Sequence, residues 1–119
     1  MPFIMAKTNV PTGRAKELEI KTKLGKAIGL VPGKSEQVLL AGFEENWHFY
    51  LRGAELPVAY IEASLFGSEA HEGYDALTAA ITRAFSEVLG IPPENIYIKY
   101  DDITAWGVGG AYIDRGGFR

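Results

Sequence analysis

The chain has 119 residues, a formal net charge of −3 and a sequence pI of about 5.4. This acidic balance argues against a general nucleic-acid surface, and no apolar run approaches the ~20 residues that a membrane-spanning helix needs. Because cysteine is absent, disulfides, thiol catalysis and a cysteine zinc site are excluded. The two histidines, His48 and His71, lack metal-ligand spacing, so no metal is expected.

A chain of this length is expected to form one domain, residues 1–119, with a modest core. No signal-peptide pattern comes before Pro2, which predicts a cytoplasmic protein. The alternative is secretion by a route that uses no signal peptide.

Pro2 follows the first methionine and precedes the apolar run Phe3-Ile4-Met5-Ala6. Methionine aminopeptidase usually removes Met before a small residue, which would leave Pro2 with a free secondary amine. An α-amino group titrates near pH ~7.7–8, and burial in an apolar pocket would lower its pKa toward neutrality, where a general base works best. On its own, however, Pro2 is better explained as a proline that begins an edge strand and costs no ladder hydrogen bond.

Two similar stretches each predict a strand, a helix and a second strand. The first has a strand over residues 2–8, a helix over 14–28 and a strand over 38–43. The second has strands over 57–64 and 96–100, on either side of a helix. Two consecutive βαβ units predict an α+β fold, in which a four-stranded mixed sheet carries both helices on one face.

The two predicted helices differ in how clearly the spacing of apolar residues indicates them. In the second, apolar residues recur every three or four positions, at Tyr74, Leu77, Ile81, Ala84, Phe85 and Val88. Ser68 or a neighbour is expected to cap its start, and Gly90 to end it. The first helix has a weaker face of Leu18, Lys21, Leu24 or Gly25, and Ile28.

The predicted strands carry apolar side chains on both sides of the pleat, more than one layer of helices can cover. These residues are Leu39, Leu40, Phe43, Val58, Tyr60, Ile61, Ile96, Ile98 and Tyr100. We therefore expect self-association to bury the second sheet face.

A series of short motifs resembles one known family over essentially the whole chain. The motifs are Met-Pro before an apolar strand, Thr8-Asn9-Val10-Pro11, Gly33-Lys34, a strand from Pro57 to Phe66-Gly67, Leu89-Gly90-Ile91-Pro92, Ile96-Tyr97-Ile98, and a glycine-rich tail with Phe118. In order and spacing they resemble macrophage migration inhibitory factor and its bacterial homologues, in the tautomerase superfamily. The resemblance implies a homotrimer whose sheets surround a central channel, with an N-terminal proline base at each subunit interface.

The chemistry that the resemblance implies is keto–enol tautomerisation of an α-keto acid such as phenylpyruvate, without a cofactor. Pro2 matches the catalytic base of the family. Lys34 matches the lysine that holds the substrate carboxylate, although a solvated turn lysine is the simpler interpretation of this residue alone.

The remaining site residues also follow from the resemblance. Phe66 falls where the family places a backbone N–H and an aliphatic side chain beside the substrate, and Tyr97 matches a tyrosine from the neighbouring subunit. Trp106, Val108 and Phe118 would line an aromatic slot. Each of these residues also fits an ordinary core or interface position.

The chain departs from the family pattern at several positions. Lys99 replaces the usual asparagine after Tyr97-Ile98 and would add a cation to the substrate pocket. Val38 replaces an aromatic residue, and the tail is longer by residues 111–115. The Cys-x-x-Cys of some mammalian members is absent, so no thiol oxidoreductase activity is expected.

Two alternatives remain beside a phenylpyruvate-tautomerase-like enzyme. Gly13-Arg14 resembles the Gly-Arg of 4-oxalocrotonate tautomerase, whose arginine binds a dicarboxylate, and Arg14 with Lys34 and Lys99 would suit such a substrate. The other alternative is a non-catalytic binding or signalling protein of the same fold, which acts through its surface and does not use the pocket.

Overall fold

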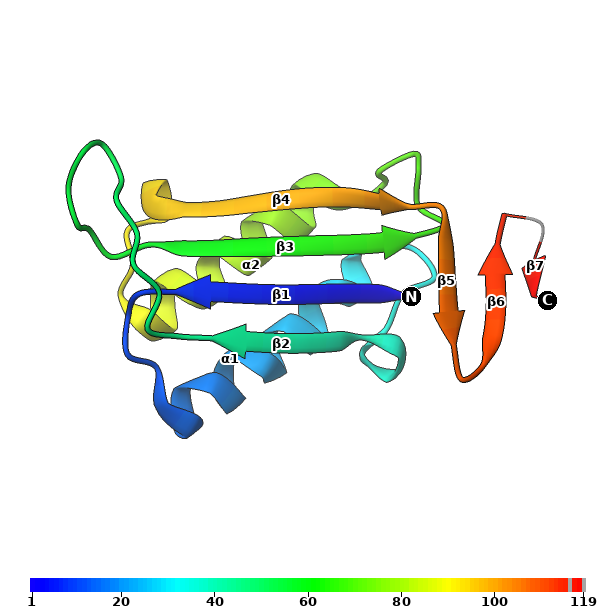
Figure 1. Cartoon of the computed structure of the whole chain (residues 1–119), viewed down its shortest axis with the longest axis horizontal. Helices are drawn as coiled ribbons and strands as arrows, with labels where there is room; N and C mark the ends of the chain where they lie inside the picture. Colours follow the sequence, from blue (N-terminus) through cyan, green and yellow to red (C-terminus); the bar gives the residue numbers. More distant parts are fainter. Residues whose placement is uncertain (116, 119) are drawn as a thin grey trace.

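The computed structural model describes residues 1–115 and 117–118 (Figure 1). Its strands are β1 (Pro2–Thr8), β2 (Leu40–Glu44), β3 (Ala59–Phe66), β4 (Ile96–Ile103), β5 (Ala105–Val108), β6 (Ala111–Asp114) and β7 (Gly117–Phe118). The α-helices are α1 (Gly13–Ala27) and α2 (Tyr74–Leu89), and the short 3-10 helices are η1 (Ile28–Leu30), η2 (Glu36–Val38) and η3 (Pro93–Asn95).

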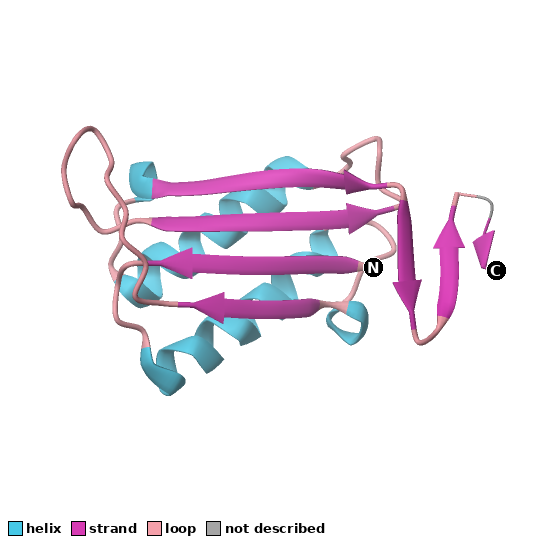
Figure 2. Cartoon of the chain, viewed as in Figure 1, coloured by secondary structure: helices cyan, strands magenta, loops and turns pink. Residues whose placement is uncertain are grey.

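The main sheet has four strands in the order β2-β1-β3-β4. β1 is parallel to β2, β3 is parallel to β4, and the central pair β1 and β3 is antiparallel. Both helices lie on one face of this sheet (Figure 2). The predicted pair of βαβ units is therefore confirmed.

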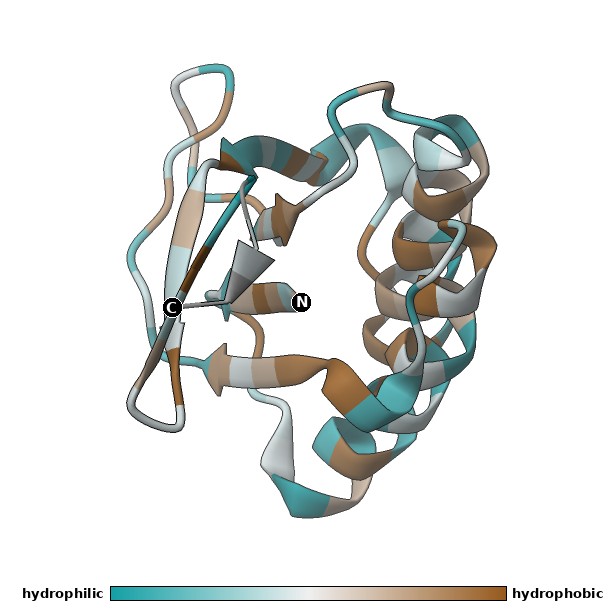
Figure 3. Cartoon of the chain, turned by 90° about the vertical axis from the view of Figure 1, so that its right-hand side faces the viewer, coloured by the Kyte–Doolittle hydropathy of each residue, from teal (hydrophilic) through white to brown (hydrophobic). Residues whose placement is uncertain are grey.

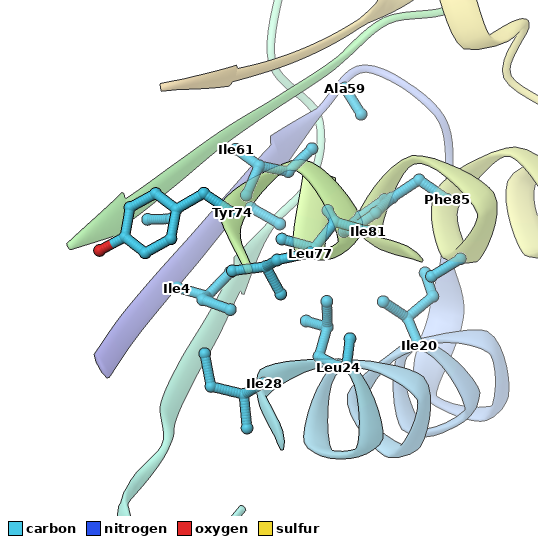
Figure 4. Packing of buried hydrophobic residues seen from close by; sticks show 14 of the residues in the cluster. Ile4, Ile20, Leu24, Ile28, Ala59, Ile61, Tyr74, Leu77, Ile81 and Phe85 are labelled. Carbon is cyan, nitrogen blue, oxygen red and sulfur yellow. The ribbon is translucent and has the colours of Figure 1, made fainter. Parts of the chain in front are cut away.

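The core lies between the sheet and the two helices (Figure 4). Along β1 and β3 every second side chain is buried, because successive residues of a strand point to opposite faces. The fully buried large side chains of this core include Ile4, Ile61, Leu65, Ile20, Leu24, Leu77, Ile81 and Phe85.

The predicted face of α1 is partly wrong. Leu18 is 48% exposed, whereas Ile20, Leu24 and Ala27 are buried. Successive residues of an α-helix are 100° apart around its axis, so Ile20, Leu24 and Ala27, spaced by four and then three residues, lie on one side of α1. Leu18 lies on nearly the opposite side from Ile20. The core face therefore begins at Ile20.

Glycines in left-handed conformation bound α2. Gly90, at φ 70°, ends the helix as predicted. The residue at the N-cap position is Gly73, at φ 83°, and not Ser68. A Cβ atom at Gly73 would lie 2.2 Å from the carbonyl oxygen of Leu30, so this close approach admits only glycine.

The open face of the main sheet is less apolar than predicted. Of the nine apolar strand residues named above, Leu39, Phe43, Ile61, Ile96, Ile98 and Tyr100 belong to the core cluster or pack against it. The open face instead carries a row of charges, in which Glu62 pairs with Lys7 at 2.9 Å and with Lys99 at 3.3 Å. An excess of apolar side chains on that face is therefore not a sufficient reason for self-association.

A second sheet of three short strands, β5-β6-β7, lies beyond the end of the main sheet that holds the amino terminus (Figures 1 and 3). The sequence predicted only a glycine-rich tail here. Gly109 and Gly110, both with positive φ, form the two-residue turn between β5 and β6, a conformation typical of tight hairpins.

Candidate active site at the amino terminus

Pro2 begins β1, a central strand of the main sheet, and its side chain is buried. It pairs with Leu65 near the end of β3. The expectation of an edge strand for a structural proline is therefore wrong. β1 places the start of the chain at one end of the sheet, beside the end of β3.

An open pocket of about 470 Å³ surrounds this start of the chain. Its lining is mainly apolar: Met1, Pro2, Phe3, Gln37, Val38, Leu40, Trp106, Gly107, Val108 and Gly109. η2 and the edge strand β2 supply one wall, and the β5–β6 hairpin supplies another. The amino terminus thus lies where apolar groups from three separate segments meet.

Lys34 is the cation beside this terminus. It follows the turn after η1, in which its backbone N–H donates to the carbonyl of the buried Val31. Its Nζ atom donates a hydrogen bond of 2.6 Å to the carbonyl oxygen of Phe66, at the end of β3. These two contacts hold the ammonium group half-buried at the edge of the site.

The terminal amine is strongly perturbed by this environment. With Met1 present, the pKa of its amine is lowered from 8.0 to about 5. Burial is the largest cause, followed by hydrogen bonding with Lys34 and the positive charge of Lys34. A buried ammonium loses hydration and is repelled by a neighbouring ammonium, so the neutral amine is favoured. At neutral pH the site therefore combines a neutral amine, able to accept a proton, with a cation able to hold an anion.

The structure brings together several of the predicted site residues. Pro2, Trp106 and Val108 line the same pocket, and Lys34 and Phe66 meet beside it. Phe66 contributes its carbonyl oxygen to Lys34. The backbone of Phe118 forms part of β7, but its side chain lies outside what the structure describes.

Tyr97 lies toward the opposite end of the main sheet, and Lys99 lies near its middle, paired with Glu62. Tyr97 pairs with Tyr60 across β3 and β4, whereas Pro2 pairs with Leu65. These two β3 positions, Tyr60 and Leu65, are five residue steps apart, which span roughly 17 Å. Within one chain Tyr97 therefore cannot reach the amine, and its predicted role requires a neighbouring subunit.

The two extra cations considered for a dicarboxylate are engaged with acidic groups. Lys99 contacts Glu62 and lies 3.6 Å from Asp101, and its pKa is raised, first by the hydrogen bond with Glu62 and then by Asp101. Arg14 is exposed at the start of α1, where its guanidinium lies 3.9 Å from Glu17. Lys34 is thus the one predicted cation that adjoins the amine within a single chain.

Sequence reasoning missed part of the pocket wall. The pocket is also lined by Gln37 and Val38 of η2 and by Leu40. Leu40 is 65% exposed. From the sequence, Val38 is a departure from the family pattern with no predicted contact. Leu40 faces the pocket because it begins β2, directly opposite Phe3 of β1.

Among residues 1–115 and 117–118, no group of three histidine or acidic side chains is placed to hold a metal ion. In the same part of the chain, neither helix is both long enough and apolar enough to cross a membrane.

The fold and pocket together define a small α+β protein that holds its terminal amine in an apolar pocket beside a lysine. The chain belongs to the macrophage migration inhibitory factor family, whose model matches residues 1–112. No curated protein matches the sequence. The motif-based recognition of the family and its tautomerase-type fold are therefore confirmed.

Solved structures agree with this assignment. The chain is similar to MIF2 of Leishmania major, with 25% identity and a TM-score of 0.87 over 94% of this chain and 97% of that one. It is similar in fold to Pt0534 inactivated by 2-oxo-3-pentynoate, with 17% identity and a TM-score of 0.80 over 91% and 93% of the two chains. A fused wild-type 4-OT that forms a symmetric trimer has 19% identity and a TM-score of 0.78 over 90% and 91%.

Proposed function

We propose that this protein is a cofactor-independent tautomerase that interconverts the keto and enol forms of an α-keto acid, with phenylpyruvate as the model substrate. The observation that carries the proposal is the terminal amine, which lies in an apolar pocket with its pKa lowered by burial and by Lys34. In the structure this amine belongs to Met1; once Met1 has been removed, Pro2, which lines the same pocket, carries the terminal amine. While Met1 is attached, the nitrogen of Pro2 is an amide and has no basic lone pair.

In the proposed reaction the Pro2 amine removes a proton from the carbon next to the keto group. The electron pair of that C–H bond forms the C=C bond of the enol, while the carbonyl π electrons move to oxygen. This oxygen then takes the proton from the Pro2 ammonium, which regenerates the neutral amine. The ammonium group of Lys34 holds the substrate carboxylate through a charge-assisted hydrogen bond. The apolar walls, including Trp106 and Val108, receive the organic group of the substrate.

The same proposal includes a homotrimer. The trimeric assembly of the fused 4-OT of similar fold supports it. A ring of three subunits would bring the Tyr97 end of one chain to the Pro2 end of the next, which one chain cannot do by itself.

An α-keto acid with one carboxylate suits the site better than a dicarboxylate. Lys34 adjoins the amine, while Arg14 and Lys99 are occupied by acidic partners away from it. That 2-oxo-3-pentynoate, an α-keto acid, inactivates a protein of similar fold supports the same substrate class.

The test compares two forms of the protein whose amino termini are defined by intact mass. The form that begins at Pro2 is expected to convert phenylpyruvate, and a form that keeps Met1 is expected to be inactive. Pro2→Gly should retain a weaker primary-amine activity. Equal turnover by the two wild-type forms would exclude Pro2 as the base, and inactivity of the trimmed form would favour the non-catalytic binding protein.

A further inference from the structure

A second group of aromatic side chains lies at the end of the molecule opposite the amine. Phe49, Tyr50, Leu51, Val58, Tyr60 and Tyr97 line an open hollow of about 180 Å³. Tyr50 is 69% exposed and Tyr97 is 52% exposed. Two neighbouring tyrosines are thus presented to solvent by different segments, Tyr97 by β4 and Tyr50 by the loop between β2 and β3 (Figure 1).

This loop is held in place by specific hydrogen bonds. Leu51 and Ala54 exchange two backbone hydrogen bonds, of 2.9 and 3.1 Å. Arg52 donates to the side-chain oxygen of Asn95, which is buried just before β4 and donates in turn to the carbonyl of Pro57. The loop is therefore tied to the start of β4, and Tyr50 is kept beside Tyr97.

The pocket at the amino end has an apolar rim that is left uncovered in one chain. Val38, Leu40 and Val108 line it, and all three are exposed. A single chain therefore has two solvent-exposed apolar surfaces, one at each end of the main sheet. A head-to-tail contact joins surfaces of these two kinds, and a closed ring leaves neither uncovered.

We propose that Tyr50 enters the pocket of the neighbouring protomer next to Tyr97 and selects substrates with a bulky apolar group. The inference rests on the proposed tautomerase activity and trimer, and goes beyond them by adding a specificity-determining residue from the loop between β2 and β3. The ring of Tyr50 covers the outer wall of the pocket, where it packs on the part of the substrate farthest from the carboxylate at Lys34. A small α-keto acid does not reach this wall.

The first test is a change in specificity, measured as proton–deuterium exchange at C3 of phenylpyruvate and of 2-oxobutanoate. Loss of one aromatic contact predicts that Tyr50→Ala lowers kcat/KM for phenylpyruvate roughly two- to tenfold and leaves that for 2-oxobutanoate unchanged. Tyr50→Phe should restore the wild-type ratio. Glu55→Ala, an exposed change in the same loop outside the hollow, serves as the control. An unchanged ratio in Tyr50→Ala would overturn the proposal.

The second test asks whether Tyr50 acts across the subunit interface. Lys34→Ala and Tyr50→Ala chains are refolded together, so that some pockets with an intact Lys34 acquire an intact Tyr50 from the next chain. Phenylpyruvate exchange should exceed the sum of the two variants refolded separately. If Tyr50 serves the pocket of its own chain, mixing restores nothing and the proposal fails.

A third measurement does not depend on any enzymatic activity. Because the natural chain has no cysteine, Tyr50→Cys with Val108→Cys can be treated with a short bismaleimide. Covalent species of three chains are expected, whereas Glu87→Cys with Val108→Cys, which places one thiol on exposed α2, should give none. Cross-linking in an inactive protein would separate failure of the proposed function from failure of this inference. Absence of cross-linked chains in the Tyr50 pair would overturn the inference.

Discussion

The ammonium nitrogen of Lys34 donates a hydrogen bond of 2.6 Å to the carbonyl oxygen of Phe66, 32 residues away in the chain. Phe66 follows Leu65, the partner of Pro2 across the central strand pair. The same short segment of β3 therefore positions both the lysine and the start of the chain. The proposed base and the proposed carboxylate-binding group are aligned by one strand end.

Replacing Lys34 should affect an acid substrate more than its ester. A charge-assisted hydrogen bond contributes about 1.5–3 kcal/mol, so Lys34→Ala should lower kcat/KM for phenylpyruvate about ten- to a hundredfold. The loss should be much smaller for methyl phenylpyruvate, which has no carboxylate. Equal losses on both substrates would show that Lys34 supports the structure and does not bind the carboxylate.

Lys34→Ala should also raise the pKa of the terminal amine. Burial is the largest cause of the lowered pKa and would remain, but the hydrogen bond and positive charge of Lys34 would be lost. Because the protonated amine cannot accept a proton, the acid limb of kcat/KM against pH should move to higher pH. An unmoved limb would mean that Lys34 does not act on the base.

Glu45 should make folding stability depend on pH in the acid range. Its carboxylate accepts the backbone N–H groups of Thr12 and Gly13 at the start of α1, and these hydrogen bonds lower its pKa below 4.5. Its stabilising effect is therefore complete above the unfolded pKa and is lost as the pH falls through the lower folded pKa. The Tm difference between wild type and Glu45→Ala should be present at pH 7 and vanish in acid. Glu55→Ala should show no such difference.

Gly73→Ala should be strongly destabilising. A left-handed conformation costs a residue with a Cβ atom roughly 1–2 kcal/mol, and the added methyl group would also strike the carbonyl oxygen of Leu30. We expect a loss of more than about 2 kcal/mol in the free energy of unfolding by denaturant titration. Gly29→Ala is a matched control, because that glycine has no positive φ and open space beside it. Similar stabilities of the two variants would contradict the close approach at Gly73.

The proposed assembly predicts a solution mass near three times the 13.0 kDa of the chain. Dilution that dissociates the trimer should abolish phenylpyruvate turnover, because each pocket would lose Tyr97 of its neighbour. Sedimentation velocity over a concentration series, with activity measured on the same samples, checks this. A monodisperse and active monomer would disprove both the assembly and the shared site.

The sequence predicted the main sheet and α2 well because their residues repeat regularly. Tyr74, Leu77 and Ile81 follow the helical period, and Gly90 ends α2 in the left-handed conformation that favours glycine. The β5–β6 hairpin was missed because its strands have only four residues each and little apolar alternation. The Gly109-Gly110 pair was the local signal that could have identified the turn.

The candidate site was predicted from short motifs shared with the family more than from the spacing of apolar residues. Pro2 and Lys34 stand in recognisable contexts, and the structure brings both to the amino end of the sheet. Leu40 was assigned to a strand with no role in the pocket, because its place at the pocket follows from pairing with Phe3, 37 positions earlier. Such long-range pairing is set by the folded topology and has no local sequence signature.

The main sheet is built from two βαβ halves related by an approximate twofold axis that passes between the antiparallel strands β1 and β3. Under this pseudosymmetry the start of β1, which carries Pro2, corresponds to the start of β3, just after Pro57 at the opposite end. A polypeptide has a single α-amino group, so only one of these two equivalent ends can carry a basic proline nitrogen. The other end is therefore released from that chemical constraint, and its side chains are free to diverge toward different roles.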